Sequence, residues 1–134
     1  MCNADYAPAD LYQQSVRRAR KEHRCAECYR RIEAGETYRY VFGVWSGVSS
    51  SYHVCQHCNI ALLWLVAECN GFMHEGIKEE IHEHAQEYNR STTGFSLYRI
   101  AIGMDRKWRR KDGTMMPPPK IPSISQKQGR TDHQ

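Results

Sequence analysis

Two CxxC pairs constrain the fold of this chain more than any other feature of its sequence. Cys25 and Cys28 form the first pair, Cys55 and Cys58 form the second, and the 26 residues 29–54 separate them. Four thiols at this spacing can close one tetrahedral zinc site. We therefore predict a single structural Zn²⁺. Because four protein ligands leave no position open for a substrate or an activated water, we also predict that the protein is not an enzyme.

Histidines beside the second pair leave the ligand set open. His53 or His57 could replace one of the four cysteines, although a histidine in this place more often hydrogen-bonds to a ligand from outside the set. Cys69 follows Cys58 by eleven residues. That spacing is about 16 Å along a helix, so Cys69 cannot join the same ion. We expect Cys2 to be a terminal thiol and Cys69 to be a core cysteine.

The sequence between the two pairs predicts a β-hairpin. Residues 37–45 and 48–54 are rich in aromatic and β-branched side chains, and Ser46-Gly47 lies between them as a two-residue turn. Such a turn fixes the register of the two strands. The expected pairs are Trp45 with Val48, Val41 with Tyr52, Tyr40 with His53, and Tyr38 with Cys55.

Four segments outside the hairpin predict helices. The first runs from about Pro8 to Glu22, with an acidic opening turn and cations in its last turn. The run Ile60 to Ala67 is apolar on every face, which predicts a central helix starting near Asn59, with the second cysteine pair at its N-terminus. Ile77 to Tyr88 and Leu97 to Trp108 carry apolar stripes that can cover it. Any uncovered part of the central helix could form a homodimer or partner seam.

The order of these features resembles a known class of zinc finger. A cysteine knuckle, a hairpin and a helix whose first turn supplies the last ligands resemble a treble clef over residues 23–69. The same stretch is similar to small zinc-finger proteins of unknown function encoded by bacteriophages and prophages. The residues that carry this resemblance are His23, Cys25, Cys28, Ile32, Gly35, Glu36, Tyr38, Trp45, Cys55 and Cys58. It implies an accessory protein in the host-cell cytoplasm and no particular activity.

The fold class expected from these features is α+β. We predict one zinc-stabilised domain over residues 1–112, made of the finger at 23–69 and a helical extension at 70–112. Residues 113–134 lack apolar periodicity, which predicts a flexible, disordered C-terminal tail. The longest apolar run is much shorter than the about 20 residues that a membrane span requires, so we expect a cytoplasmic protein that does not bind membranes.

Charge patterning gives two hypotheses for function. The net charge of +4 is small, so local clusters of charge are more informative than the total. The candidate binding residues are Arg17, Arg18, Arg20, Lys21, Arg24, Arg30 and Arg31 in the first half, and Arg106, Lys107, Trp108, Arg109, Arg110 and Lys111 in the second. Opposed acidic and basic segments, the apolar central helix and the phage resemblance favour a protein that docks on a host protein and modulates or inhibits it. The alternative is a regulator that binds DNA or RNA directly through the basic patches.

Overall fold

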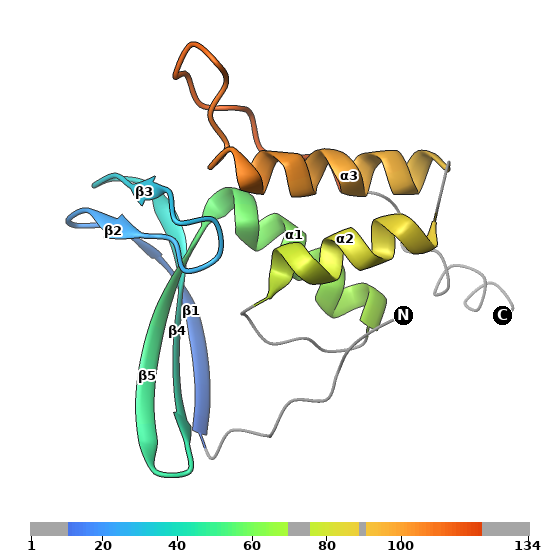
Figure 1. Cartoon of the computed structure of the whole chain (residues 1–134). Helices are drawn as coiled ribbons and strands as arrows, with labels where there is room; N and C mark the ends of the chain where they lie inside the picture. Colours follow the sequence, from blue (N-terminus) through green and yellow to red (C-terminus); the bar gives the residue numbers. More distant parts are fainter. Residues whose placement is uncertain (1–10, 70–75, 89–90, 122–134) are drawn as a thin grey trace, which may run out of the picture.

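The protein is a small α+β molecule. The computed structural model describes residues 11–69, 76–88 and 91–121, and within these ranges the chain forms five strands and three helices. The helices lie together on one side of the main sheet (Figure 1). None of the described helices is long and apolar enough to cross a membrane.

The main sheet has three antiparallel strands in the order β1 (Leu11–Arg18), β4 (Thr37–Trp45) and β5 (Val48–Cys55). The predicted hairpin register is confirmed at all four pairs, from Trp45 with Val48 to Tyr38 with Cys55. Ser46 and Gly47 have φ angles of 52° and 81°, as a tight turn with the twist of a hairpin requires. The local turn sequence is therefore sufficient to set this register.

The prediction of a helix from Pro8 to Glu22 is wrong for the described residues. Leu11 to Arg18 form β1, which pairs with β4 over its whole length, from Leu11 opposite Val44 to Arg18 opposite Thr37. The apolar stripe of this segment is thin, so a helix would bury little apolar surface. As a strand, the segment instead forms a complete ladder of backbone hydrogen bonds with the free edge of β4. The pairing partner lies far away in the sequence and outweighs the local helix signals.

A second, two-stranded ribbon carries the first cysteine pair. β2 (His23–Arg24) pairs with β3 (Arg31–Ile32), and the chain between them turns through Tyr29, whose φ is 67°. The Cys25 N–H donates to the Arg30 carbonyl at 2.9 Å, and the Ala26 N–H donates to the His53 carbonyl of β5 at 2.8 Å. These bonds hold the cysteine knuckle against the end of β5.

The three helices are α1 (Gln56–Cys69), α2 (Ile77–Glu87) and α3 (Thr92–Asp105). The core includes α1 side chains such as Trp64 and Leu65, together with the predicted stripes of the two later helices. Ser91 caps α3, since its side chain accepts a hydrogen bond from the Gly94 N–H. The apolar α1 is not fully covered by described residues, because Leu63 stays 48% exposed.

The chain leaves α3 earlier than the sequence predicts. The helix ends at Asp105 rather than Trp108, and Lys107 and Trp108 adopt φ angles of 55° and 59°. The segment then folds back, so that Arg109 and Met115 form an isolated antiparallel bridge. Met115 and the following Met116 pack against the core, which extends the contacts of the folded part beyond residue 112.

Candidate metal centre

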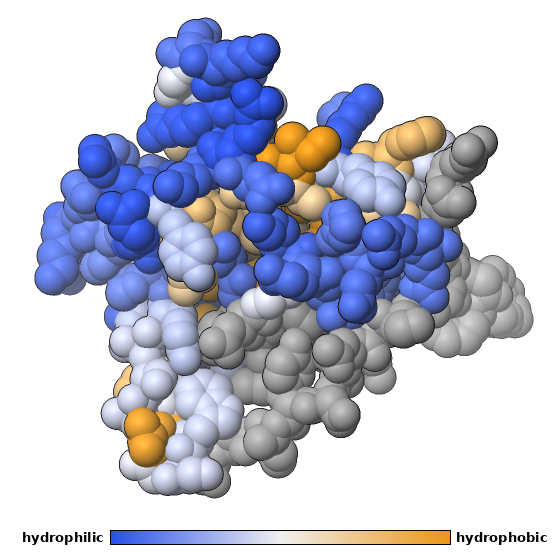
Figure 2. All heavy atoms as spheres, viewed as in Figure 1, coloured by the Kyte–Doolittle hydropathy of each residue, from blue (hydrophilic) through white to orange (hydrophobic). Residues whose placement is uncertain are grey.

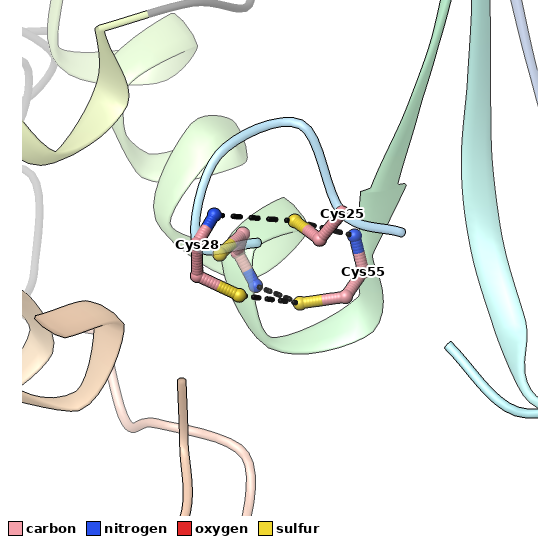
Figure 3. A group of neighbouring side chains, drawn as sticks. Cys25, Cys28 and Cys55 are labelled. Atoms are coloured by element: carbon pink, nitrogen blue, oxygen red, sulfur yellow. Dashed lines mark hydrogen bonds between the residues drawn. The ribbon is translucent and has the colours of Figure 1, made fainter. Parts of the chain in front are cut away.

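Four cysteine sulfurs meet at the junction of the ribbon, the sheet and α1. Cys25, Cys28, Cys55 and Cys58 are all buried, and their sulfur atoms lie within 4.8 Å of one another (Figure 3). The Cys28 and Cys55 sulfurs are 3.8 Å apart. Four ligands at metal–sulfur distances of about 2.3 Å around a tetrahedral ion would have sulfur–sulfur separations of about 3.8 Å. The cluster therefore fits a metal ion.

Each sulfur is positioned by backbone geometry that the sequence spacing sets. Cys25 and Cys28 lie on the knuckle after β2, Cys55 is the last residue of β5, and Cys58 lies in the first turn of α1. The N–H groups of Glu27 and Cys55 donate to the Cys25 sulfur, each at 3.3 Å, and the Cys58 N–H donates to the Cys55 sulfur at 3.4 Å. Such bonds favour thiolates over thiols. Among the four side chains, hydrogen bonds from Cys28, Cys55 and Cys58 lower the pKa of Cys25, and the bonds to Cys25 in turn raise the pKa of Cys28 and Cys58.

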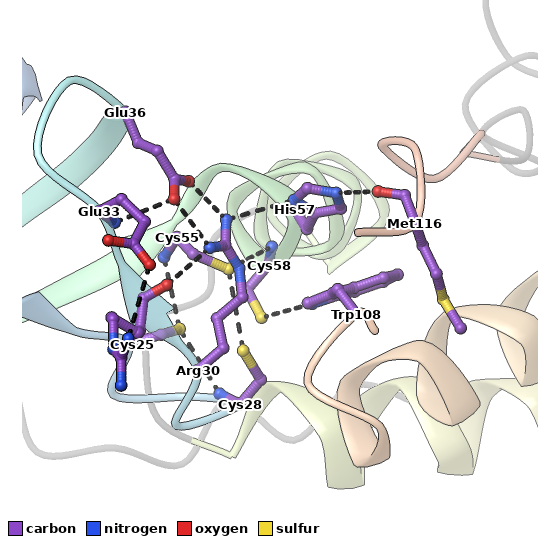
Figure 4. A network of polar contacts seen from close by, with 11 residues as sticks. Cys25, Cys28, Arg30, Glu33, Glu36, Cys55, His57, Cys58, Trp108 and Met116 are labelled. Carbon is purple, nitrogen blue, oxygen red and sulfur yellow. Dashed lines mark hydrogen bonds and ion pairs between the residues drawn. The ribbon is translucent and has the colours of Figure 1, made fainter. Parts of the chain in front are cut away.

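A buried arginine lies beside the four sulfurs. Arg30 is 2% exposed, and its guanidinium donates two hydrogen bonds to the Glu36 carboxylate, at 2.8 and 3.2 Å (Figure 4). Burial alone would lower the pKa of Arg30, but Glu36 and the negative charge of Cys55 raise it. Four thiolates around a divalent ion carry a net charge of 2 − 4 = −2. Arg30 therefore places a positive charge where it offsets this negative charge, and Glu36 holds it there.

The segment after α3 also reaches the centre. The Trp108 indole N–H donates to the Cys58 sulfur at 3.4 Å, and His57 Nε2 lies 2.7 Å from the Met116 carbonyl (Figure 4). His57 Nδ1 lies 3.5 Å from an Arg30 nitrogen. Because a guanidinium only donates, Nδ1 is an acceptor and Nε2–H donates to Met116, so the imidazole is neutral. Spacing gives no signal for the Trp108 contact, because 50 residues separate the two partners.

The structure places the two histidines outside the group of four sulfurs. His57 is engaged by Met116 and Arg30, as described above. His53 stacks on His23, with ring centroids 4.1 Å apart, and also contacts the rings of Tyr38 and Tyr40. Burial, followed by the nearby charges of His23, Arg17 and Lys21, lowers the pKa of His53.

A second group of potential ligands lies between α1 and α2. Ligand atoms of Cys69, Glu80 and His84 are within 4.8 Å of one another. Cys69 is disulfide-bonded, unlike the four free cysteines of the centre, so its sulfur is not available as a thiolate. This bond differs from the expectation of a core thiol at Cys69. The other unassigned cysteine, Cys2, lies outside the described residues.

The two predicted basic segments occupy different surroundings. Hydrophilic residues gather over the β2–β3 ribbon and over the segment after α3 (Figure 2). In the first half, Arg17, Arg18, Arg20, Lys21, Arg24 and Arg31 are exposed, whereas Arg30 is buried. In the second half, Trp108 is only 2% exposed, so its ring belongs to the core. The arginines beside Trp108 donate to the turn that follows: Arg109 to the Gly113 carbonyl, and Arg110 to the Thr114 hydroxyl and the Met115 carbonyl.

Comparison of the chain with protein-family models, with curated proteins and with solved structures finds no match. The similarity to phage-encoded zinc fingers therefore stays a resemblance in a few spaced residues. The site itself is defined by its geometry, as four buried thiols within metal-binding distance.

Proposed function

We propose that this protein is a non-enzymatic, zinc-stabilised module that binds nucleic acid. One observation carries the proposal: a group of exposed cations lies beside aromatic side chains on the sheet, on a surface without acidic lining. This preference differs from the one drawn from the sequence, which favours docking on a host protein. That docking, the phage origin and a homodimer stay predictions, because no described contact specifies the partner.

Zinc is the ion that suits the centre best. Tetrahedral sites made of four thiolates are typical of structural zinc, and soft sulfur ligands disfavour magnesium and calcium. The order of knuckle, hairpin and helix supports a treble-clef-like arrangement around this ion. All four ligand positions are filled by protein, so the ion organises surfaces instead of activating a substrate. The binding surface is then sought on the elements that the ion holds together.

The basic surface is centred on residues 17–21, where β1 ends. Arg17, Arg18, Arg20 and Lys21 line a hollow of about 820 Å³ together with His23 and Tyr38. In the described part of the chain, none of these four cations lies within 4 Å of a carboxylate. Their charge is therefore available to an anionic partner. Closely spaced phosphates of a nucleic acid are the partner that such a row of cations attracts most strongly.

A charge-matched pair of triple variants tests the proposal. Arg17, Arg20 and Lys21 are changed to Ala in one protein, and Arg106, Lys111 and Lys120 are changed to Ala in the other. Binding of labelled oligonucleotides is measured by fluorescence anisotropy between about 50 and 200 mM salt. We expect the first triple variant to weaken binding much more than the second. It should also reduce the slope of log K against log salt concentration by about 2, because each phosphate contact on a single strand contributes about 0.7 to that slope. Equal losses in both variants, or no binding by the unaltered protein, would contradict the proposal.

A further inference from the structure

We infer that the ligand is single-stranded, with its unpaired bases stacked on Phe42 and on the Arg17–Tyr40 pair and its phosphates on residues 17–21. This inference deepens the proposed function and rests on it. It assigns a role to the aromatic side chains of the central strand, which the metal centre does not use.

The alternation of side chains along β4 determines which way its aromatic rings point. Successive residues of a strand alternate between the two faces of a sheet, so Tyr40 and Phe42 share one face and Val41 lies on the other. Val41 is fully buried, and on its face Arg39 donates to the Asn59 side chain of α1 at 2.5 Å. The Val41 face is therefore the one covered by the helices. Tyr40 and Phe42 lie on the opposite face, where both are half-buried.

The face that carries Tyr40 and Phe42 is hollowed. The two rings line a hollow of about 380 Å³ with Gln13, Ser15 and Arg17, whose positions on β1 share their face, and with Gln14, the β1 partner of Val41. The β1 partners of the two aromatics are Ser15 and Gln13, whose polar side chains can donate and accept hydrogen bonds. The hollow therefore combines flat apolar rings with polar groups at its rim, which are the two kinds of contact that an exposed base makes.

The hollow beside Tyr40 and Phe42 is continuous with the basic surface. Arg17 lines both this hollow and the larger one around residues 17–21, and its guanidinium lies 4.0 Å from the centroid of the Tyr40 ring. None of the residues lining either hollow is acidic. By contrast, the hollow between α2 and α3 is lined by Glu79, Glu83 and Asp105, which would repel phosphates. One continuous surface thus offers cations for a backbone and rings for bases.

Stacking on exposed rings distinguishes a single strand from a duplex. The faces of paired bases are covered by their neighbours in the stack, so a duplex can use the cations but not the rings. A single strand can place its bases on Phe42 or on the Arg17 guanidinium, which lies over the Tyr40 ring, since aromatic rings and arginine planes are both stacking platforms. Bases and phosphates are common to DNA and RNA, so strands of both kinds are expected to bind.

The experiment compares three ligands of about twelve nucleotides, a length within the range that single-strand binding surfaces occupy. They are a pyrimidine strand, its duplex, and a strand of equal charge whose central positions are abasic. The protein variants are Phe42→Leu and Tyr40→Leu, with Phe95→Leu as the control, because Phe95 is an exposed aromatic on α3, away from the sheet. Bound metal and circular dichroism confirm that each variant is folded.

We expect the single strand to bind at least tenfold more tightly than the duplex and the abasic strand. Phe42→Leu and Tyr40→Leu should each lose about tenfold in affinity for the single strand, whereas Phe95→Leu should lose none. If the duplex or the abasic strand binds as well as the intact strand, and Phe42→Leu has no effect, the inference is overturned while nucleic-acid binding stands. If neither strand nor duplex binds at about 50 mM salt, the proposed function fails and the inference fails with it.

Discussion

The two basic segments look alike in the sequence, but the structure gives them different surroundings. Around residues 17–21, the cations border an outward-facing sheet surface with half-buried aromatic rings. Around residues 106–111, the aromatic ring is Trp108, which is buried and bound to the Cys58 sulfur, and two arginines fasten the following turn. A cluster of cations around an aromatic residue can therefore be a binding surface or part of the fold, depending on whether the ring points to solvent or into the core.

Metal removal is expected to have the largest effect, because the centre supports both segments. The backbone of Ala19 is joined to Glu36 and Gly35 near the centre, and Trp108 contacts Cys58 directly. Structural zinc sites contribute about 10–16 kcal/mol of apparent binding free energy, which equals or exceeds the stability of a small domain. We expect chelation to unfold the protein cooperatively, with one equivalent of zinc released. Circular dichroism measures the ellipticity and elemental analysis measures the bound metal. Full ellipticity in protein that has lost all of its metal would show that the fold does not depend on the centre.

Substitution of Trp108 tests whether the second segment is structural. Trp108→Ala removes a buried indole and should lower the free energy of unfolding by about 4 kcal/mol. Trp108→Phe keeps most of the packing but loses the N–H donated to Cys58, so we expect a loss of about 1 kcal/mol. Urea unfolding measures both values. The folded Trp108→Phe variant should bind oligonucleotides with unchanged affinity. A marked loss of affinity would show that the Trp108 ring takes part in binding.

The Arg30–Glu36 pair, which lies between the two segments, is expected to stabilise the fold by an amount that depends on pH. Burial would raise the pKa of Glu36, but the hydrogen bond from Arg30 and the backbone bond from Glu33 lower it. A carboxylate with a lowered folded-state pKa contributes stability that is present above its ordinary value of about 4.3 and is lost as the pH falls through the folded-state value. Glu36→Gln should therefore lower the free energy of unfolding by about 2 kcal/mol near neutral pH, because the substitution removes charge-assisted bonds to the buried Arg30.

The matched control for this variant is Glu33→Gln. The Glu33 side chain is exposed, and its ion pair among the described residues is a 3.8 Å contact with the exposed Arg31 side chain, so its replacement, which keeps the backbone bond to Glu36, should change the stability by less than about 1 kcal/mol. Unfolding is measured from neutral pH down to about pH 3, which covers the range below about 4.3 where the contribution of Glu36 is lost, with bound zinc followed at each pH. If Glu36→Gln and Glu33→Gln are equally stable at neutral pH, Arg30 does not depend on Glu36.

The features that could be predicted from the sequence are those set by neighbouring residues. The turn at Ser46-Gly47 determines the hairpin register, and the CxxC spacing determines which sulfurs meet. The strand β1 could not be predicted in the same way, because its ladder comes from β4, whose paired residues lie 19 (Arg18 with Thr37) to 33 (Leu11 with Val44) positions away in the sequence. The contact of Trp108 with Cys58 likewise depends on how α3 packs, and the burial of Arg30 depends on its bond to Glu36. Nothing in the local sequence distinguishes these residues from exposed ones.

The smallest expected effect concerns Arg109 and Arg110, whose guanidinium groups donate to the turn at residues 113–115. The three side-chain bonds that these arginines make to the turn are exposed to solvent, so changing the two residues to Gln should lower the free energy of unfolding by about 1 kcal/mol in total. The change removes two positive charges, as does a paired variant with Arg20→Gln and Lys21→Gln. If the sheet surface is the binding site, the Arg20 and Lys21 variant binds oligonucleotides more weakly. The Arg109 and Arg110 variant binds them nearly as well as the unaltered protein, apart from a small long-range charge effect that disappears above about 0.15 M salt. Anisotropy titrations at two salt concentrations separate these outcomes. An equal loss of affinity in the Arg109 and Arg110 variant would contradict the different roles of the two segments, because the turn would then bind phosphates as well as close the fold.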